Sequence, residues 1–383
     1  MAYEGLLRDV DIVVDEDGRV WLGKELHGDE KIDCKGLLAL HGFANVHTHL
    51  THGFSAWSNP KDFSWLKHHE EIYPREAAIE IAKLSLVNSL ETGTTLVADT
   101  TPYFEVLSLA AEKVGLRYIP VSRWGSGEGL TGSPILIESI EQMEESLDEV
   151  AGLQVKGNRL LLMHVSSDKR LVFQFRKEKG KFPVEYLYSK GVLGSKTILL
   201  SPGWITSWEV GLVAESGAKV AVTPVASLHL ADGGLLPHSV LAERGVTPGL
   251  CSDSPVIGIT ANMVEQVKTY YLYQRGFFEN EAFSIYDAYL SSTSGGYRAL
   301  GIMDGLIKDG VKADLVFYAL DELALNGFLG PPEQFFLALN GQRAKYVVVE
   351  GELVLSPERR GELYELKRKS LERLRDLGYP QEA

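Results

Sequence analysis

The stretch LLALHGFANVHTHL, residues 37–50, decides how this chain folds. Its leucine-rich first half is typical of a buried strand, which carries His47 and His49 to the loop that follows. Residues two apart on a strand point to the same face, so both imidazoles can bind one cation, and zinc accepts neutral imidazole nitrogens readily. Two histidines in a hydrogen-bonded polar pocket are the simpler alternative, so the rest of the chain has to decide between the two.

The composition is that of a globular protein, and we expect its partner to be a small molecule. With 383 residues, 45% of them hydrophobic, the chain is long enough for one large α/β domain and a small second one. A net charge of -14 argues against nonspecific nucleic-acid binding. The sequence has no apolar run of membrane-spanning length, and its first residues lack the pattern of a secretory signal. The two cysteines, Cys34 and Cys251, are too few for a disulfide framework, so we expect a cytoplasmic protein.

Strand-like runs alternate with helical patterns through the middle of the chain. This alternation predicts a parallel sheet, and its length indicates an α/β fold of the (β/α)8 TIM-type barrel. After residue 50 the strand-like runs are TTLVADT, LRYIPVS, RLLLMHVS, TILLS, KVAVTPV and TPGLCSD.

The two ends of the chain predict a second, smaller unit. Short apolar runs separated by Gly and Asp turns occupy the first 40 residues, and the runs ADLVFYAL and AKYVVVEGELVLS follow residue 312. We expect residues 1–43 and 311–383 to form a small β-sandwich with an exposed C-terminal helix, and residues 44–310 to form the metal-binding barrel.

Chemistry in such barrels gathers where the strands end. His164 follows RLLLM and Asp253 follows TPGLCS, so both would stand near His47 and His49. Three imidazoles and one carboxylate suit one divalent metal ion, zinc first, with iron and manganese as the alternatives. Taken alone, His164 could be a core histidine and Asp253 a helix N-cap.

The order of these motifs resembles the amidohydrolase superfamily, specifically its deaminase and chlorohydrolase branch, over nearly the whole chain. GFANVHTHL is similar to the first-strand metal motif of that family, and FPVEYLYSKGVLGSKTILLS to the segment that leads to its sixth strand. SSTSGGYRALGIMDGLIKDGVKADLVFY is similar to the return of the chain to the sandwich. The resemblance implies a metal-dependent hydrolase that acts on a C–N bond, in an amide, a cyclic amide or a related group, of a small molecule.

The resemblance also assigns roles to the four residues. It implies that His47, His49, His164 and Asp253 bind the metal and that Asp253 is the catalytic base. The metal would lower the pKa of its bound water, Asp253 would take the proton, and the hydroxide would attack an electrophilic carbon. No lysine stands where binuclear relatives have their bridging carbamate, so we expect a single metal ion. A homodimer is a further expectation from the family.

Two positions depart from the family pattern. Deaminase members have a glutamate three residues after the fifth-strand histidine, where this chain has Ser167. A serine hydroxyl cannot serve as a carboxylic acid, and the neighbouring Asp168 would point elsewhere. Ser201 replaces the sixth-strand histidine. Two alternatives therefore remain: a catalytically degenerate protein with a binding or regulatory role, and an aminopurine-type deaminase with a non-standard proton donor.

The segment between LRYIPVS and RLLLMHVS is shorter than in the family. It holds one helical pattern, ILIESIEQMEESLDEVAGL, where a further strand and helix are usual. Either a strand is hidden in LQVKGNR, or the barrel is abbreviated or distorted there.

The remaining candidates would line a substrate pocket at the barrel mouth. Arg123 can bind a substrate anion or form an ion pair with another side chain. The substrate-binding candidates are His52, Trp57, Ser167, Ser201 and His229.

Overall fold

The computed structural model describes most of the chain. The described residues are 6–53, 73–125, 132–145, 149–150, 152, 159–231, 234–258, 260–303, 305–325, 335–339 and 341–379.

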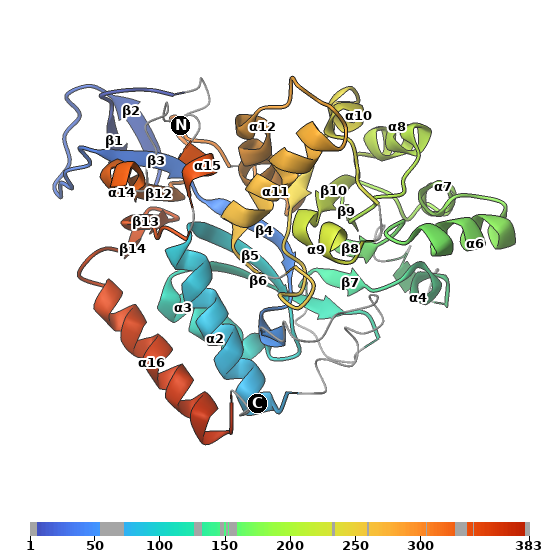
Figure 1. Ribbon diagram of the computed structural model, residues 1–383, viewed down its shortest axis with the longest axis horizontal. Helices are drawn as coiled ribbons and strands as arrows, with labels where there is room; N and C mark the ends of the chain where they lie inside the picture. Colours follow the sequence, from blue (N-terminus) through green and yellow to red (C-terminus); the bar gives the residue numbers. More distant parts are fainter. Residues whose placement is uncertain are drawn as a thin grey trace.

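Eight parallel strands form the centre of the molecule, in the order β11-β10-β9-β8-β7-β6-β5-β4 (Figure 1). Their two outer members meet where Thr48 bridges Asp253, and the Asp253 N–H donates to the His47 carbonyl at 3.0 Å. This contact nearly closes the sheet and confirms the predicted barrel. The strands are β4 (Phe43–Thr48), β5 (Thr94–Thr100), β6 (Arg117–Arg123), β7 (Ile135–Ile137), β8 (Leu161–His164), β9 (Thr197–Leu200), β10 (Lys219–Val222) and β11 (Gly249–Leu250).

The short segment of the barrel contains its full strand. β7 is only 3 residues long, and it pairs in parallel with β6 on one side and β8 on the other. The expected helix over ILIESIEQMEESLDEVAGL was wrong for its first five residues, because Ile135–Ile137 form β7 and helix α4 begins at Ile140 and ends at Glu145. Three fully apolar residues fit the buried strand better than a helix face. The alternative in LQVKGNR falls almost entirely on residues 153–158, which lie outside the described part.

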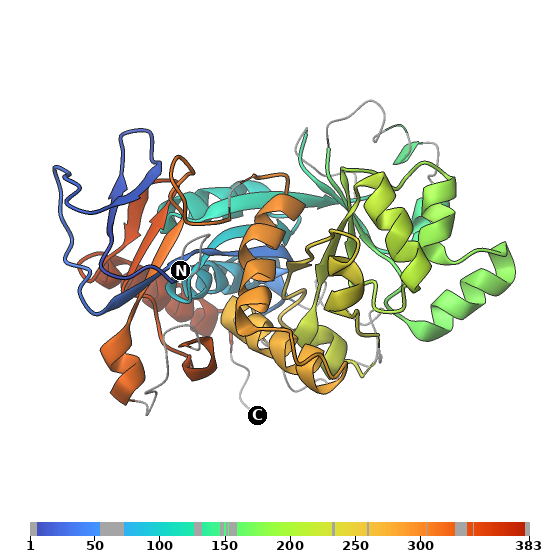
Figure 2. The same ribbon diagram turned by 90° about the horizontal axis from the view of Figure 1, so that it is seen from above.

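Helices surround the strands, as Figure 2 shows. Several carry clear boundary signals: the Thr206 hydroxyl and the Glu209 side chain form a capping box, and Gly115 ends another helix in the left-handed region. Among the described residues, no helix combines the length and the apolar character needed to cross a membrane. The helices of this layer are α2 (Arg75–Glu91), α3 (Phe104–Val114), α6 (Lys169–Lys179), α7 (Pro183–Ser189), α8 (Ser207–Ser216), α9 (Pro224–His229), α10 (His238–Ala242), α11 (Met263–Gly276), α12 (Ile285–Leu290) and α13 (Gly296–Ala299), with the single turns η1 (Leu50–His52) and η3 (Ser291–Gly295).

Segments from both ends of the chain form one antiparallel sheet beside the barrel, in the order β14-β13-β12-β3. A separate hairpin, β1 with β2, packs near it around Val20 and Leu315. This arrangement agrees with the expected joining of head and tail, while the domain boundaries at residues 43 and 311 stay a prediction. The elements are β1 (Asp11–Val14), β2 (Val20–Gly23), β3 (Leu37–His41), β12 (Leu315–Ala319), β13 (Tyr346–Val349), β14 (Glu352–Leu355), α14 (Leu320–Leu325), α15 (Phe335–Ala338) and α16 (Arg360–Asp376).

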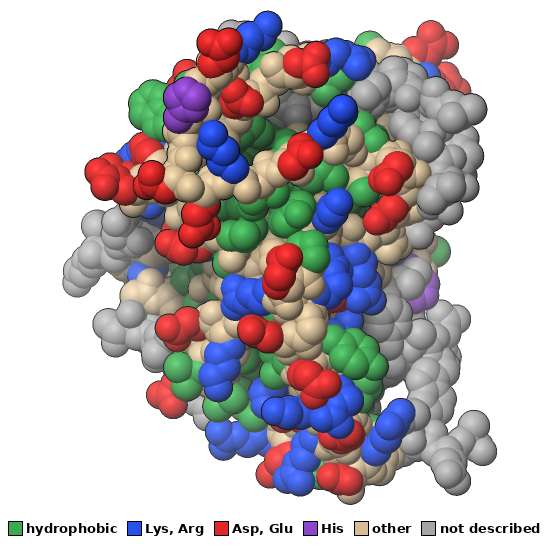
Figure 3. Space-filling model, turned by 90° about the vertical axis from the view of Figure 1, so that its left-hand side faces the viewer, with side chains coloured by type: hydrophobic (Ala, Val, Ile, Leu, Met, Phe, Trp, Pro, Cys, Tyr) green, Lys and Arg blue, Asp and Glu red, His purple; other side chains and the backbone are tan. Residues whose placement is uncertain are grey.

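The C-terminal helix α16 is anchored to the barrel through Glu91 at the end of α2. This buried carboxylate accepts from Arg343 at 2.6 Å and from Lys367 at 3.0 Å. On the face of the molecule seen in Figure 3, acidic and basic side chains are interspersed. That face therefore presents no field of a single sign to a polyanion.

Candidate metal centre

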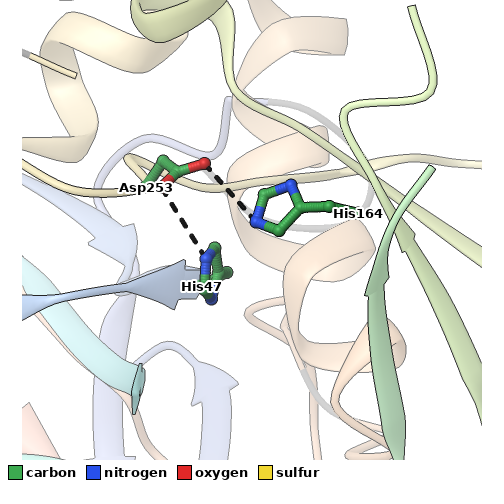
Figure 4. Close-up of side chains that lie close together, drawn as sticks. All are labelled: His47, His164 and Asp253. Atoms are coloured by element: carbon green, nitrogen blue, oxygen red, sulfur yellow. Dashed lines mark ion pairs between the residues drawn. The ribbon is translucent and has the colours of Figure 1, made fainter. Parts of the chain in front are cut away.

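Three side chains of the metal-ligand type meet at the carboxyl end of the barrel (Figure 4). His47 comes from β4, His164 from β8, and Asp253 from the segment after β11. His47 Nε2 lies 3.8 Å from Asp253 Oδ1, His164 Nε2 lies 3.8 Å from Asp253 Oδ2, and one ligand atom of each residue falls within 4.8 Å of the others. Ligand atoms about 2.0–2.2 Å from one zinc ion are about 3.3 Å apart, so small side-chain movements suffice to bind an ion.

The backbone of Asp253 is strained, and hydrogen bonds hold the residue in this conformation. Its φ of 59° lies in the left-handed region, which a non-glycine residue adopts only when its surroundings impose it. Three hydrogen bonds do so: the Asp253 N–H donates to the His47 carbonyl, the Thr48 hydroxyl donates to the Asp253 carbonyl at 3.0 Å, and the Ser254 N–H donates to Asp253 Oδ1 at 2.7 Å. Together they fix the carboxylate against the first strand.

Burial keeps His47 in the neutral form that binds metals. Its pKa is lowered well below the usual value, first by loss of solvent and then by the positive charge that His49, His164, Arg123 and His52 bring near it. A neutral imidazole is the ligand form of histidine, so metal binding costs no deprotonation of His47 near neutral pH.

The polar atoms of this cluster also need a partner. Within the described part of the chain, neither ring nitrogen of His47 and not Asp253 Oδ2 has a hydrogen-bond partner, although both residues are fully buried. Buried polar groups in folded proteins are nearly always satisfied, because an unsatisfied one costs about 1–3 kcal/mol. These residues therefore fit a divalent metal ion.

His49 lies beside the cluster, outside the group of three. Its ring meets that of His47 edge to face, with centroids 4.8 Å apart, and is stacked on His52 with centroids 4.6 Å apart. Its role as a fourth ligand stays a prediction. Trp57, expected to line the same side of the mouth, lies outside the described residues.

Two serines follow His164, the histidine at the end of the fifth strand, and only one of them is buried. Ser167 is half-buried, whereas Ser166 is only 6% exposed, and its hydroxyl has no hydrogen-bond partner among the described residues. Asp168 caps α6, accepting from the Arg170 N–H at 2.7 Å, and so does not replace the missing glutamate. The sequence interpretation missed Ser166. The period of a strand could have found it, since Ser166 stands two residues after His164.

Hydroxyls also occupy the place of the sixth-strand histidine. Ser201 follows β9 with a φ of 48°, and its buried hydroxyl forms a hydrogen bond with that of Thr223. Thr223 in turn lies 3.4 Å from the hydroxyl of Ser227 on α9. This side of the mouth thus offers neutral donors and acceptors instead of an imidazole.

Two other candidates have partners within the protein. Arg123 forms an ion pair with Glu138, 3.0 Å away, as the alternative to anion binding anticipated. His229 is exposed at the end of α9, and its Nδ1 is 2.9 Å from the Ile257 carbonyl oxygen. Substrate binding by His229 stays a prediction.

Asp99 is a further buried group whose role the sequence did not reveal. It ends β5 and accepts hydrogen bonds from the Leu50 N–H at 2.8 Å and from the Tyr118 hydroxyl at 2.7 Å. The first of these bonds holds the turn η1 directly after His49. Asp99 therefore fixes the backbone that carries the first-strand histidines.

A parallel barrel with buried histidines and an aspartate at its carboxyl end defines a metal-dependent hydrolase of the barrel type. Residues 137–354 match the family model described as the amidohydrolase family. The chain is 30% identical over 376 residues to a 5'-deoxyadenosine deaminase of Methanothermobacter thermautotrophicus, with 89% of this chain and 86% of the relative covered. The chain belongs to the amidohydrolase family.

Further comparisons agree with this assignment. A 5-methylthioadenosine/S-adenosylhomocysteine deaminase of Aquifex aeolicus is 27% identical, with 90% of this chain and 88% of the relative covered. Among solved structures, an adenosine deaminase of Xanthomonas campestris with bound zinc has a TM-score of 0.83 at 18% identity, covering 97% of this chain and 94% of that one. A zinc-bound mutant of the atrazine chlorohydrolase of Arthrobacter aurescens has a TM-score of 0.80 at 20% identity, covering 95% and 96%.

The family assignment confirms three predictions from the sequence. The chain is an enzyme of the deaminase and chlorohydrolase branch, and it is a hydrolase of non-peptide C–N bonds in small molecules. The cluster of His47, His164 and Asp253 supports a divalent metal ion as its cofactor.

Proposed function

We propose that this protein is a zinc-dependent hydrolase with one metal ion, held by His47, His49, His164 and Asp253, that cleaves an amide or cyclic amide C–N bond of a small molecule. One observation carries the proposal: buried ligand atoms of His47, His164 and Asp253 lie within 4.8 Å of one another. A bound zinc ion supplies water with a pKa near 7, which is a nucleophile at neutral pH.

Asp253 is the group that moves the proton. Its Oδ1 is engaged by the Ser254 N–H, whereas its Oδ2 has no hydrogen-bond partner in the described part of the chain. When Asp253 binds the metal through Oδ1, which lies 3.8 Å from His47 Nε2, Oδ2 is the oxygen available to accept the proton of the attacking water. The same oxygen then returns the proton to the leaving nitrogen, since a base that has accepted a proton is a general acid for the next step.

The hydroxyl groups at the mouth orient the substrate. Ser166, Ser201 and Thr223 can donate hydrogen bonds to a carbonyl or accept them from an N–H group, but they do not transfer a proton as a carboxylic acid does. This property favours a substrate whose carbonyl carbon is already electrophilic, such as an amide or a lactam, over a ring that has to be protonated before attack.

A homodimer and the absence of nucleic-acid partners stay predictions.

Deamination of an adenosine derivative is the second candidate. It is favoured by the comparisons, because relatives at 30% and 27% identity are named as deaminases of 5'-deoxyadenosine and of 5-methylthioadenosine/S-adenosylhomocysteine. Against it stands Ser167, which replaces the glutamate that the sequence resemblance expects. In a deaminase with this mouth, Asp253 has to protonate both the ring nitrogen and the leaving amino group of the substrate.

Metal content tests the proposal first. Protein purified without chelators should contain about one equivalent of zinc by elemental analysis, and His164→Ala or Asp253→Asn should release it. The matched control is Asp168→Asn, because this carboxylate follows the same strand but caps α6. A wild-type chain that contains no metal, and whose thermal unfolding does not shift when zinc, iron or manganese is added, would contradict the proposal.

A substrate panel then separates the two candidates. We expect the zinc protein to hydrolyse members of a panel of amides, imides, lactams and ureas, and to deaminate aminopurine nucleosides only after Ser167→Glu. Ser167→Gln is the control, because it adds the same bulk without an acid. Efficient deamination by the unmodified chain would establish the second candidate and overturn the interpretation of Ser167.

A further inference from the structure

We propose that His52 is a positioning residue of the metal centre and does not bind substrate. Its ring supports that of His49, and its Nδ1 connects the turn after the first strand to the segment that carries Asp253. This inference rests on the proposed metal-dependent function, since a positioned ligand has a purpose only if a metal ion is bound.

The first observation is the stacking of two imidazoles. His52 is fully buried at the end of η1, and its ring lies 4.6 Å from that of His49, with an angle of 14° between the ring planes. The His52 N–H donates to the His49 carbonyl at 3.1 Å, so backbone and side chain hold the two residues together. A parallel ring at this distance limits the rotation of the His49 side chain.

Glycine makes this arrangement possible. Gly53 follows His52 with a φ of 57°, and a Cβ at this position would come within 2.9 Å of Ile81 Cγ2 on α2. The turn therefore packs directly onto α2, and His52 is enclosed between that helix and the barrel. His52 is fully buried, so its imidazole packs against protein neighbours.

The second observation is a hydrogen bond across the mouth. His52 Nδ1 forms a hydrogen bond with the Ser254 hydroxyl, 2.8 Å away, and that hydroxyl accepts from the Val256 N–H at 3.3 Å. The Ser254 N–H donates to Asp253 Oδ1 at 2.7 Å. One continuous path thus runs from the His49 ring through His52 and Ser254 to the Asp253 carboxylate.

This path joins ligands that follow the first and the last strand of the barrel. His49 follows β4 and Asp253 follows β11, the two strands at which the barrel closes. Partners that orient metal ligands typically change metal affinity by about 10–100-fold. His52 is then expected to tighten zinc binding by this factor without being a ligand.

Two substitutions at His52 separate ring stacking from hydrogen bonding. His52→Phe keeps an aromatic ring against His49 and removes Nδ1, whereas His52→Asn keeps a hydrogen-bonding group near the Nδ1 position and removes the ring. Ser254→Ala removes the other partner of the bond. His238→Phe is the matched control, because this imidazole also places Nδ1 3.0 Å from a hydroxyl, that of Tyr270, but lies on α10.

Zinc affinity, measured by competition with a chromophoric chelator, is the first readout. The d–d absorption spectrum of the cobalt-substituted protein is the second, because it reports ligand geometry independently of activity. We expect His52→Phe, His52→Asn and Ser254→Ala each to weaken zinc binding by about 10–100-fold and to change the cobalt spectrum, while His238→Phe matches the wild type. His52→Phe and Ser254→Ala remove the same link, so their combination should weaken binding little more than either alone.

The outcomes distinguish this inference from the proposed function. A wild-type chain that binds no zinc contradicts the proposed function, and this inference with it. Wild-type zinc affinity and an unchanged cobalt spectrum in the His52 variants contradict this inference alone, as does a change confined to KM for the substrate. If His52→Phe fails to fold, Ser254→Ala tests the same link by removing one hydroxyl.

Discussion

Each end of the barrel buries an aspartate, and the two carboxylates differ in how many hydrogen bonds they accept. At the amino end, Asp314 Oδ2 accepts from the Arg117 guanidinium and from the Tyr297 hydroxyl, both at 2.8 Å, while Oδ1 accepts from the Glu350 N–H at 2.8 Å. At the carboxyl end, Asp253 Oδ1 accepts one backbone N–H, and Oδ2 has no hydrogen-bond partner among the described residues. Both side chains are fully buried.

The difference separates a structural network from a ligand site. Asp314 precedes β12 and Arg117 begins β6, so the satisfied network fastens the antiparallel sheet to the barrel. The Tyr297 hydroxyl extends this network to Thr95, 2.8 Å away. At the other end, both ring nitrogens of His47 and Asp253 Oδ2 have no hydrogen-bond partner among the described residues, as a site for an exogenous ligand requires. A buried carboxylate can therefore serve stability or binding, and the number of its partners tells which.

Asp314→Asn should give the largest loss of stability. The change removes the charge that faces Arg117, and breaking a buried ion pair costs about 3–5 kcal/mol. Urea unfolding of the metal-free protein measures the loss, and zinc affinity should stay at the wild-type value. A loss below about 1 kcal/mol would mean that Asp314 contributes no more to stability than an ordinary surface residue, and would contradict the comparison.

Acid should destabilise the metal-free protein through the carboxyl end. The folded-state pKa of His47 is well below its usual value, chiefly because of burial, whereas the unfolded chain protonates this residue near pH 6.5. The unfolded state therefore binds more protons below about pH 6.5, and stability falls by about 1.4 kcal/mol per pH unit until the folded-state pKa is reached. Above about pH 6.5 His47 is neutral in both states, so this loss is absent there, and it is complete only below the folded-state pKa.

The matched variant for this pH dependence is His47→Gln. Between about pH 7.5 and pH 5.5, the free energy of unfolding should decrease less in His47→Gln than in the wild type. The difference should be about 1.4 kcal/mol for each pH unit below about 6.5. Equal pH slopes would mean that His47 titrates alike in the folded and the unfolded chain.

Asp253→Asn should have the opposite sign to the same change at Asp314. In metal-free protein it removes a buried charge that lacks part of its hydrogen bonding, so the free energy of unfolding should rise by about 1 kcal/mol. Zinc should then stabilise the variant less than the wild type in thermal unfolding. If Asp253→Asn destabilises the metal-free protein as much as Asp314→Asn does, both carboxylates are structural.

Most strands of the barrel, and the ligand site at its carboxyl end, could be predicted from the sequence. Apolar runs with a strand period located most of the strands, and the chemistry of His47, His164 and Asp253 indicated which strand ends meet. β7 escaped notice because 3 apolar residues shortly before a helix are also compatible with a helical pattern.

The satisfied end of the barrel could not be predicted in this way. The ion pair of Arg117 with Asp314 joins residues 197 positions apart, and no local pattern marks either partner. The same limit applies to the backbone conformation of Ser166 and Ser201, because their positive φ values are imposed by the packing of the strand ends and not by residue type. Sequence periodicity thus gives the elements, whereas buried polar partners depend on how those elements pack.

Backbone strain at the carboxyl end gives the smallest expected effect. Ser201 has a φ of 48°, where glycine is free of steric cost and alanine is not. Both Ser201→Gly and Ser201→Ala lose the hydrogen bond with Thr223, so their difference isolates the backbone. Ser201→Gly should be the more stable of the two by about 1 kcal/mol in urea unfolding.

Ser122 provides the matched control for strain. Its buried hydroxyl lies 2.8 Å from that of Ser133, but it stands within the regular strand β6. There glycine has no steric advantage and costs more conformational entropy on folding, so Ser122→Gly should be less stable than Ser122→Ala. If both sites rank glycine and alanine alike, the strand end at Ser201 stores no strain. If the order reverses only at Ser201, the strain lies at the same end of the barrel as Asp253 Oδ2, which has no hydrogen-bond partner among the described residues, and ligand binding rather than stability accounts for it.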